Sequence, residues 1–255
     1  MSSLRSVAPV LFALALCATP PVASAQSFSD TQRGDIEKIV KDYLVTHPEV
    51  LEEAMGELSK RQAADEAKKH EANVAENAKT IFNSPRGVVL GNKDGDVTFV
   101  EFFDYNCGYC KRAMSDMLDL LKTDPKLKVV LKEFPVLSPG SVEAAQVAVA
   151  VRMQDPTGKK YLDFHQRLLG GRGPADKAHA LAAAKDAGLD IARIEKDMAS
   201  PEAKATIEEN FKLAEAMGMN GTPSYVIGKQ VVIGAIGLDG LKEKIDVARC
   251  GKATC

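Results

Sequence analysis

A strand, an amphipathic helix and a second strand follow one another in the middle of this chain, and their order limits the fold more than any other feature. Residues 97–103 are rich in aromatic and β-branched side chains, which predicts a buried strand. Residues 107–122 carry apolar side chains on one helical face, and residues 128–131 predict a second core strand. Such a unit joins two parallel strands, so we expect an α/β domain.

The second half of the chain predicts mostly helices. Residues 140–218 hold no strand candidate and contain several helical segments separated by Gly and Pro. Residues 224–227 and 230–233 then predict two short strands joined as a hairpin. A last helix is expected at about residues 238–248. We therefore predict a small sheet domain interrupted by a helical insert at about residues 140–218.

The first 25 residues predict an export signal that is not part of the fold. Arg5 is followed by an apolar run at residues 10–16, and the small residues Ala23-Ser24-Ala25 suit cleavage after Ala25. The run is well short of the roughly 20 apolar residues of a membrane span. Cys17 would suggest a lipoprotein, but Leu16 precedes it where a small residue is needed. We expect an exported protein without a membrane span.

Composition excludes one class of partner and directs attention to the cysteines. The chain has 33 basic and 35 acidic side chains and a formal net charge of −2, so no polycationic surface for nucleic acid is expected. Of its five cysteines, four remain after cleavage: Cys107, Cys110, Cys250 and Cys255. An even number in an oxidising compartment favours disulfide pairing.

Residues 26–80 predict a helical arm ahead of the main domain. Apolar side chains recur there at helical spacing, and Pro48 suits the first turn of a second helix after a bend near His47. Residues 59–80 are rich in Ala and charged side chains, which is typical of a solvent-exposed helical spacer. We expect residues 30–58 to mediate oligomerisation; the alternative is that the arm packs on its own domain. The apolar stripes consist of Ile36, Ile39, Val40, Tyr43, Leu44, Leu51, Ala54 and Leu58.

The sequence Cys107-Gly108-Tyr109-Cys110 lies where the first strand gives way to its helix. A thiolate at a helix start is stabilised by free N–H groups and by the helix dipole. The two sulfurs lie one helical turn apart, so they can close a disulfide. We predict that Cys107 is the exposed attacking sulfur and that Cys110 is the shielded sulfur that resolves a mixed disulfide.

Other uses of these cysteines fit the sequence less well. Covalent haem attachment is excluded because Lys111, and not His, follows Cys110. A zinc site needs two more ligands, and Cys250 and Cys255 lie about 140 residues away. We therefore expect no metal and no cofactor beyond the redox disulfide. Cys250 and Cys255 predict a structural disulfide, with a second redox centre as the alternative. The four histidines show no ligand pattern and are expected to be solvated.

Three motifs resemble the DsbA-type thiol–disulfide oxidoreductases. They are residues 101–110 (EFFDYNCGYC), Lys132-Glu133-Phe134-Pro135 and Gly221-Thr222-Pro223-Ser224. The resemblance covers residues 88–248 and implies a thioredoxin fold with an inserted helical domain, here within residues 81–255. The N-terminal arm resembles the ScsC-type branch of this family, whose members oligomerise through such an extension and can act as disulfide isomerases.

The resemblance also implies roles for single residues. Pro223 matches the cis-proline beside the active-site disulfide, and Thr222 would pair through its backbone with an extended substrate. We also expect the Thr222 hydroxyl to reach the Cys107 sulfur. Glu101 matches a buried acid that moves a proton to or from Cys110, with Lys132 as its candidate partner. The alternatives are an ordinary trans proline and a strand glutamate that faces solvent.

The residues between the two cysteines distinguish members of the family. Gly108-Tyr109 replaces the Pro-His of DsbA and, together with Thr222, resembles DsbC-type isomerases. Without the histidine charge the thiolate is less stable, so the disulfide is less oxidising. We expect a periplasmic disulfide isomerase or reductase that acts on cysteine-containing exported proteins. A membrane thiol–disulfide exchange partner would reset it, and it would form a homo-oligomer, with a trimer favoured. The alternatives are a monomeric DsbA-like dithiol oxidase and a non-catalytic peptide-binding holdase.

Overall fold

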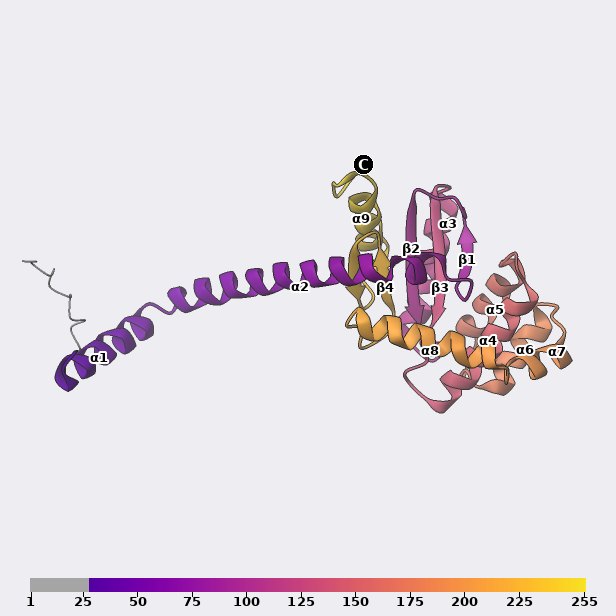
Figure 1. The fold of residues 1–255 in the computed structure, drawn as a ribbon, viewed down its shortest axis with the longest axis horizontal. Helices are drawn as coiled ribbons and strands as arrows, with labels where there is room; N and C mark the ends of the chain where they lie inside the picture. Colours follow the sequence, from indigo (N-terminus) through magenta and orange to yellow (C-terminus); the bar gives the residue numbers. More distant parts are fainter. Residues whose placement is uncertain (1–27) are drawn as a thin grey trace, which may run out of the picture. The chain divides into compact units, whose positions relative to one another are not determined.

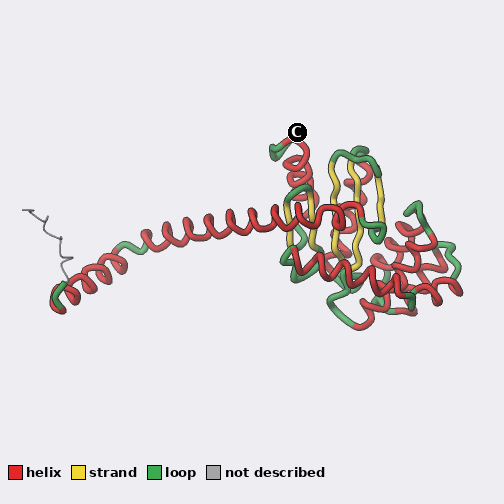
Figure 2. The backbone as a smooth tube through the Cα atoms, in the orientation of Figure 1, coloured by secondary structure: helices red, strands yellow, loops and turns green. Residues whose placement is uncertain are grey.

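The computed structural model describes residues 28–255, so the predicted signal peptide, residues 1–25, lies outside the described residues. The helices and strands are drawn in Figure 1 and coloured by type in Figure 2. In chain order they are α1 (Asp30–Thr46), α2 (Glu49–Asn83), β1 (Val88–Gly91), β2 (Val97–Phe103), α3 (Gly108–Thr123), β3 (Leu127–Glu133), α4 (Pro139–Gln154), α5 (Lys159–Gly170), α6 (Lys177–Asp186), α7 (Ile191–Asp197), α8 (Pro201–Ala216), β4 (Ser224–Ile227), β5 (Gln230–Ile233) and α9 (Gly237–Cys250).

The chain divides into two compact units, of which the first ends at Leu58. In that unit α1 begins at a capping box formed by Ser29 and Gln32 and ends at Thr46, with His47 as its C-cap, so the predicted break between two helices near His47 is confirmed. No residue of α1 is buried. Both predicted apolar stripes are therefore uncovered within this unit. Their exposed members include Ile36 at 41%, Ile39 at 67%, Val40 at 50%, Tyr43 at 51%, Leu51 at 46% and Leu58 at 55%.

The second unit, Ser59–Cys255, includes the last part of α2. Val74 and Ile81 are 2% and 0% exposed, and the Asn73 side chain donates a hydrogen bond to the Ala216 carbonyl at 2.7 Å. Val74 is the first large apolar side chain after Leu58, which explains why packing begins there. The exposed spacer is therefore shorter than the predicted range 59–80.

The sheet has five strands in the order β1-β3-β2-β4-β5. Strands β2 and β3 are parallel and joined through α3, so the predicted strand–helix–strand unit is confirmed. The other three pairs are antiparallel. The hairpin strands β4 and β5 have the predicted bounds, and α4 to α8 form the insert. The α/β architecture with a helical insert is thus confirmed, while β1 and α7 were not predicted.

Alternate residues of the central strands face two different cores. Phe99 and Phe103 of β2 belong to the larger core, which also takes in buried residues of α3, α9 and the insert. Phe102 belongs to a smaller core formed with α8 and the end of α2. Because Glu101 alternates with Phe102 and Lys132 pairs in register with Phe102, these two charged residues lie on opposite faces of the sheet.

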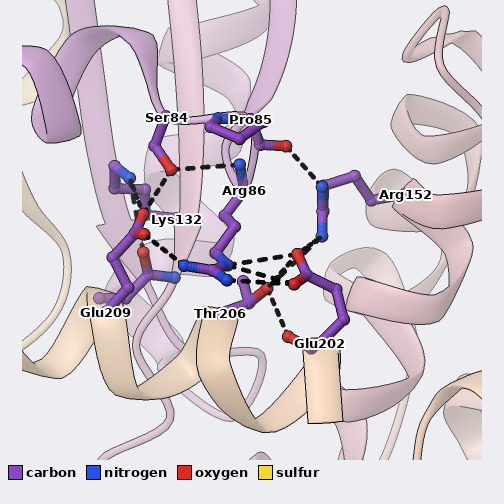
Figure 3. Close-up of polar contacts among 9 residues, drawn as sticks. Ser84, Pro85, Arg86, Lys132, Arg152, Glu202, Thr206 and Glu209 are labelled. Carbon is purple, nitrogen blue, oxygen red and sulfur yellow. Dashed lines mark hydrogen bonds and ion pairs between the residues drawn. The ribbon is translucent and has the colours of Figure 1, made fainter. Parts of the chain in front are cut away.

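A polar network ties the segment after α2 to the insert (Figure 3). The Arg86 guanidinium contacts the carboxylates of Glu202 at 3.2 Å and Glu209 at 3.0 Å, both on α8. Arg152 of α4 pairs with Glu202 at 3.2 Å, and the Lys132 ammonium lies 3.8 Å from Glu209. Lys132 is 1% exposed, and burial lowers its pKa to about 8, although Glu209 partly offsets this. The network fixes Lys132 on the face of the sheet that carries α8.

Candidate active site

The two cysteines of the motif lie at the first turn of α3. Cys107 is the N-cap residue, and its sulfur accepts a hydrogen bond from the Cys110 N–H at 3.4 Å. The helix start therefore directs an N–H group at this sulfur, which lies at the positive end of the helix dipole. Both cysteines are free thiols. Cys107 is 6% exposed and Cys110 is 1% exposed, so Cys107 is the more accessible sulfur but is less exposed than predicted.

Cys110 lies in the core directly behind Cys107. Burial raises its pKa, and nearby negative charge on Glu101 and Cys107 raises it further. Cys110 is therefore held as a neutral thiol, and it needs a base before it can attack a disulfide. This difference in environment separates the chemistry of two sulfurs that lie within one helical turn.

The loop before β4 packs against Cys107. The peptide bond between Thr222 and Pro223 is cis, as the resemblance implies. The Cys107 thiol donates a hydrogen bond to the Thr222 carbonyl at 3.1 Å. The expected contact from the Thr222 hydroxyl is absent, because that hydroxyl is buried without a partner among residues 28–255. The backbone of Thr222, and not its side chain, holds the attacking sulfur.

Glu101 lies on β2 and is 4% exposed, so it faces the core and not solvent. Its neighbours across the sheet are Leu131 on β3 and Tyr225 on β4. Burial raises the pKa of Glu101 to about 8, and the negative charge of Asp116 adds to this. A carboxyl with this pKa can give or accept a proton near neutral pH. The predicted pairing with Lys132 is wrong, since that residue lies on the opposite face of the sheet.

Sequence reasoning missed the residues that fix the loop before Cys107. The Asp104 carboxylate accepts hydrogen bonds from the backbone N–H groups of Asn106 at 2.8 Å, Val136 at 2.9 Å and Leu137 at 3.0 Å. The Asn106 amide pairs with both backbone groups of Ala175, at 2.9 and 2.8 Å. The only signal in the sequence was the run of polar residues between strand and motif. These bonds join the loop to the segment that follows β3 and, through Ala175, to the helical insert.

Tyr105 connects the same loop to α5 through a buried polar cluster. Its hydroxyl lies 3.3 Å from both the Tyr161 hydroxyl and the His165 ring, and Tyr161 donates a hydrogen bond to the Glu133 carboxyl. Burial raises the pKa of Glu133 to about 8 and lowers the pKa of His165 to about 3. Both groups are therefore mainly neutral at pH 7. His165 is 2% exposed, so the prediction that it is solvated is wrong.

The surface beside Cys107 is partly apolar. Tyr109 is 60% exposed, and the Arg112 guanidinium lies 4.4 Å from its ring centroid. Leu137, in the segment held by Asp104, is 54% exposed. Both side chains are large and exposed, and they lie on segments joined to the loop before Cys107.

The C-terminal cysteines form a separate feature. A disulfide joins Cys250, the last residue of α9, to Cys255, and both residues are exposed. Across residues 28–255, no three His, Cys, Asp or Glu side chains are grouped to hold a metal ion. In the same range, no helix combines the length and apolar character of a membrane-spanning segment.

Comparison with known protein families agrees with this geometry. The DSBA-like thioredoxin domain matches residues 98–246, which is more than half of the chain. The chain belongs to the DsbA-like thioredoxin family. Residues 32–65 match a second family, the N-terminal domain of the copper resistance protein ScsC. The predicted thioredoxin fold with a helical insert and N-terminal helices is therefore confirmed.

Two solved structures are similar over most of this chain. A thioredoxin-like oxidoreductase from Silicibacter pomeroyi is 43% identical, with a TM-score of 0.64, over 67% of this chain and 96% of that one. Proteus mirabilis ScsC, in a transitional conformation, is 29% identical, with a TM-score of 0.64, over 88% of this chain and 98% of that one.

The curated relatives include proteins of two kinds. Disulfide bond formation protein D of Bacillus subtilis is 26% identical over 176 residues, which is 64% of this chain and 78% of that protein. A Na(+)/H(+) antiporter NhaA of Salinispora arenicola is 26% identical over 168 residues, or 65% of this chain. The match covers 25% of the antiporter, so this chain corresponds to only about a quarter of that relative.

Proposed function

We propose that this protein is an exported thiol–disulfide oxidoreductase that reduces and isomerises disulfides in other proteins through Cys107 and Cys110. The observation that carries the proposal is the placement of the Cys107 sulfur. It lies between the Cys110 N–H at the start of α3 and the Thr222 carbonyl, with buried Cys110 and Glu101 behind it. A non-catalytic peptide-binding holdase would need neither the buried acid nor a sulfur at a helix start.

The first chemical step belongs to Cys107. Its thiolate attacks one sulfur of a substrate disulfide, which forms a mixed disulfide and releases the other substrate sulfur as a thiolate. In isomerisation that thiolate, or another on the substrate, then attacks elsewhere in the substrate. A substrate thiolate finally displaces Cys107, so neither the enzyme nor the substrate is oxidised or reduced overall.

Cys110 resolves the mixed disulfide when the substrate is reduced and not isomerised. Glu101 accepts the Cys110 proton, and the Cys110 thiolate attacks the Cys107 sulfur of the mixed disulfide. The bond between Cys107 and the substrate breaks, and the substrate leaves as a thiolate that takes up a proton. The substrate disulfide is reduced to two thiols while the Cys107–Cys110 dithiol is oxidised. A membrane thiol–disulfide exchange partner would return Cys107–Cys110 to the dithiol state.

The backbone beside Pro223 supports binding of an extended polypeptide. No group among residues 28–255 accepts a hydrogen bond from the Thr222 N–H. This N–H lies in the loop that also presents its carbonyl to Cys107, so a bound strand would be placed beside the attacking sulfur. Cysteine-containing exported proteins are the substrates we infer.

We favour isomerase over oxidase activity because no cation lies between the two cysteines. Gly108-Tyr109 supplies no positive charge to stabilise a thiolate on Cys107, and Tyr109 is 60% exposed. A less stable thiolate makes a less oxidising disulfide, which favours reduction and isomerisation over oxidation. The ScsC-like N-terminal match and the uncovered stripes of residues 36–58 support a homo-oligomer, for which we favour a trimer. The predicted signal peptide supports a periplasmic location.

The cysteine chemistry is tested by refolding disulfide-scrambled ribonuclease with the reduced mature protein. Cys107→Ser should abolish refolding, because no mixed disulfide can form. Cys110→Ser should accumulate mixed disulfides that are visible by mass spectrometry. The double variant Cys250→Ser, Cys255→Ser is the matched control and should keep its activity, because this exposed pair only ties the end of α9 to the C-terminal residue. Full activity of Cys107→Ser would leave only the holdase, and oxidation of dithiols without isomerisation would favour the oxidase.

The oligomer is tested in the full-length mature chain. Replacing Ile36, Val40 and Leu51 together by Glu should give a monomer, because each large side chain contributes roughly 1.5–3 kcal/mol when covered. The monomer should still reduce a small disulfide but lose most isomerase activity, since several active sites facing one space raise the local concentration of catalyst. Lys38→Glu on the same helix is the control. An unchanged mass, measured by sedimentation, would contradict this role of the stripes.

A further inference from the structure

Tyr225 carries a polar group that the proposed mechanism does not use. It lies on β4 and is 1% exposed, and its ring packs against Phe99 with centroids 5.2 Å apart. Its hydroxyl is fully buried and has no hydrogen-bond partner among residues 28–255. A buried hydroxyl without a partner costs free energy, and a phenylalanine would fill this place without that cost.

The sheet places this hydroxyl-bearing side chain beside Glu101. Tyr225 and Glu101 are directly opposite in the antiparallel pair of β4 and β2. Residues in this relation project from the same face, with Cβ atoms about 4.5–5.5 Å apart. Tyr225, Cys107 and Cys110 belong to the same buried core on that face.

The charges around Tyr225 keep its hydroxyl in the neutral form. Burial raises its pKa, and so does negative charge on Glu101, Cys110, Asp116 and Cys107. The hydroxyl is therefore a hydrogen-bond donor throughout the working pH range. Across the sheet, Glu101 has the apolar Leu131 of β3 on one side and Tyr225 of β4 on the other. Asp116 of α3 acts on Glu101 through its negative charge, and its own pKa is raised by burial and by the charges of Asp119 and of Asp239 of α9.

We propose that Tyr225 is a positioning residue whose hydroxyl donates a hydrogen bond to the Glu101 carboxylate while Glu101 is ionised and ready to accept the Cys110 proton. The inference rests on the proposed role of Glu101. In the step, the Cys110 S–H bond breaks and a Glu101 O–H bond forms. The Cys110 thiolate then attacks the Cys107 sulfur, and the substrate sulfur leaves with its electron pair. While Glu101 is protonated it carries no charge that needs a donor, which accounts for an unpaired Tyr225 hydroxyl in the resting dithiol.

The test is Tyr225→Phe in the full-length mature protein, with glutathione disulfide as the substrate. The rate at which Cys110 resolves the glutathione mixed disulfide is followed by acid quenching and mass spectrometry across pH. A hydrogen bond to a charged group is lost, so the pH midpoint of this step should rise by about one unit, and the rate at pH 7 should fall about tenfold. Resistance to urea should not decrease, because only an unpaired hydroxyl is removed.

A double-mutant comparison separates this inference from the proposal beneath it. In Glu101→Gln the pH dependence should disappear, and adding Tyr225→Phe should change nothing further. An unmoved midpoint in Tyr225→Phe, or an equal loss of rate with and without Glu101, overturns the role of Tyr225 alone. A Glu101→Gln variant that keeps the wild-type pH profile overturns the role of Glu101, and the inference with it.

Discussion

Glu101→Gln should change the stability of the protein in a way that depends on pH. In the folded reduced protein, burial raises the pKa of Glu101 from 4.5 to about 8. Between these two values the folded state binds more protons than the unfolded state, so the free energy of unfolding falls as the pH rises. The contribution of Glu101 to the free energy of unfolding decreases from about pH 4.5 upward and is fully lost above about pH 8.

The magnitude follows from the size of the shift. A full proton difference changes the free energy of unfolding by about 1.4 kcal/mol per pH unit, so Glu101 should remove about 3 kcal/mol between pH 5 and pH 7. Glutamine does not titrate, so the variant should lack this loss. Glu133, whose pKa is also raised to about 8, adds a second loss of the same sign in both proteins. The difference between variant and wild type therefore isolates Glu101.

Urea denaturation of the reduced proteins at several pH values, at one fixed protein concentration, measures this difference. The stability of Glu101→Gln relative to the wild type should increase by about 3 kcal/mol from pH 5 to pH 7. Glu208→Gln is the matched control, because Glu208 lies on the surface of α8 with its side chain 54% exposed. If the two variants show the same pH dependence, the reasoning about the buried carboxyl is wrong.

Three further predictions concern the sulfurs and the two faces of the sheet. Iodoacetamide should label Cys107 of the reduced protein well before Cys110, which burial holds as a thiol; preferential labelling of Cys110, read by peptide mass spectrometry, would reverse their roles. Thr222→Val should leave the reduction potential unchanged against glutathione, because the Cys107 contact is to the Thr222 carbonyl; a large shift would show that the hydroxyl takes part. Lys132→Met should destabilise the protein by about 2 kcal/mol, because Glu209 loses one of its cationic partners; an unchanged urea midpoint would contradict this.

The sequence predicts well those elements whose signal is local. Strand β2 was expected at residues 97–103 and the hairpin strands at 224–227 and 230–233, and the structure has these bounds. Aromatic and β-branched residues between turn signals suffice to identify such strands. Strand β1 was missed because its four residues, Val88–Gly91, are defined by antiparallel pairing with β3, about 40 residues away.

The same distinction holds for the site. Cys107 and Cys110 could be selected because a motif and its position in a strand–helix unit are both local. Lys132 could not be placed, since a shift of one residue along a strand moves a side chain to the other face of the sheet. The contact of Tyr105 with His165 was invisible because it joins residues 60 positions apart.

The structure explains how two sulfurs one helical turn apart acquire different reactivity. Strand β2 ends at Phe103, and a four-residue loop held by Asp104 and Asn106 carries the chain to the start of α3. The helix start brings an N–H group to the first sulfur, while the first turn carries the second sulfur down into the core above the inward face of β2. Glu101, two residues before the end of β2, faces the same side of the sheet, because side chains alternate along a strand. The acid that serves Cys110 is therefore placed on this face. The opposite environments of the two sulfurs, and the position of the base, thus follow from a single strand–loop–helix junction, and a substitution that slips this junction by one residue should disable both sulfurs together.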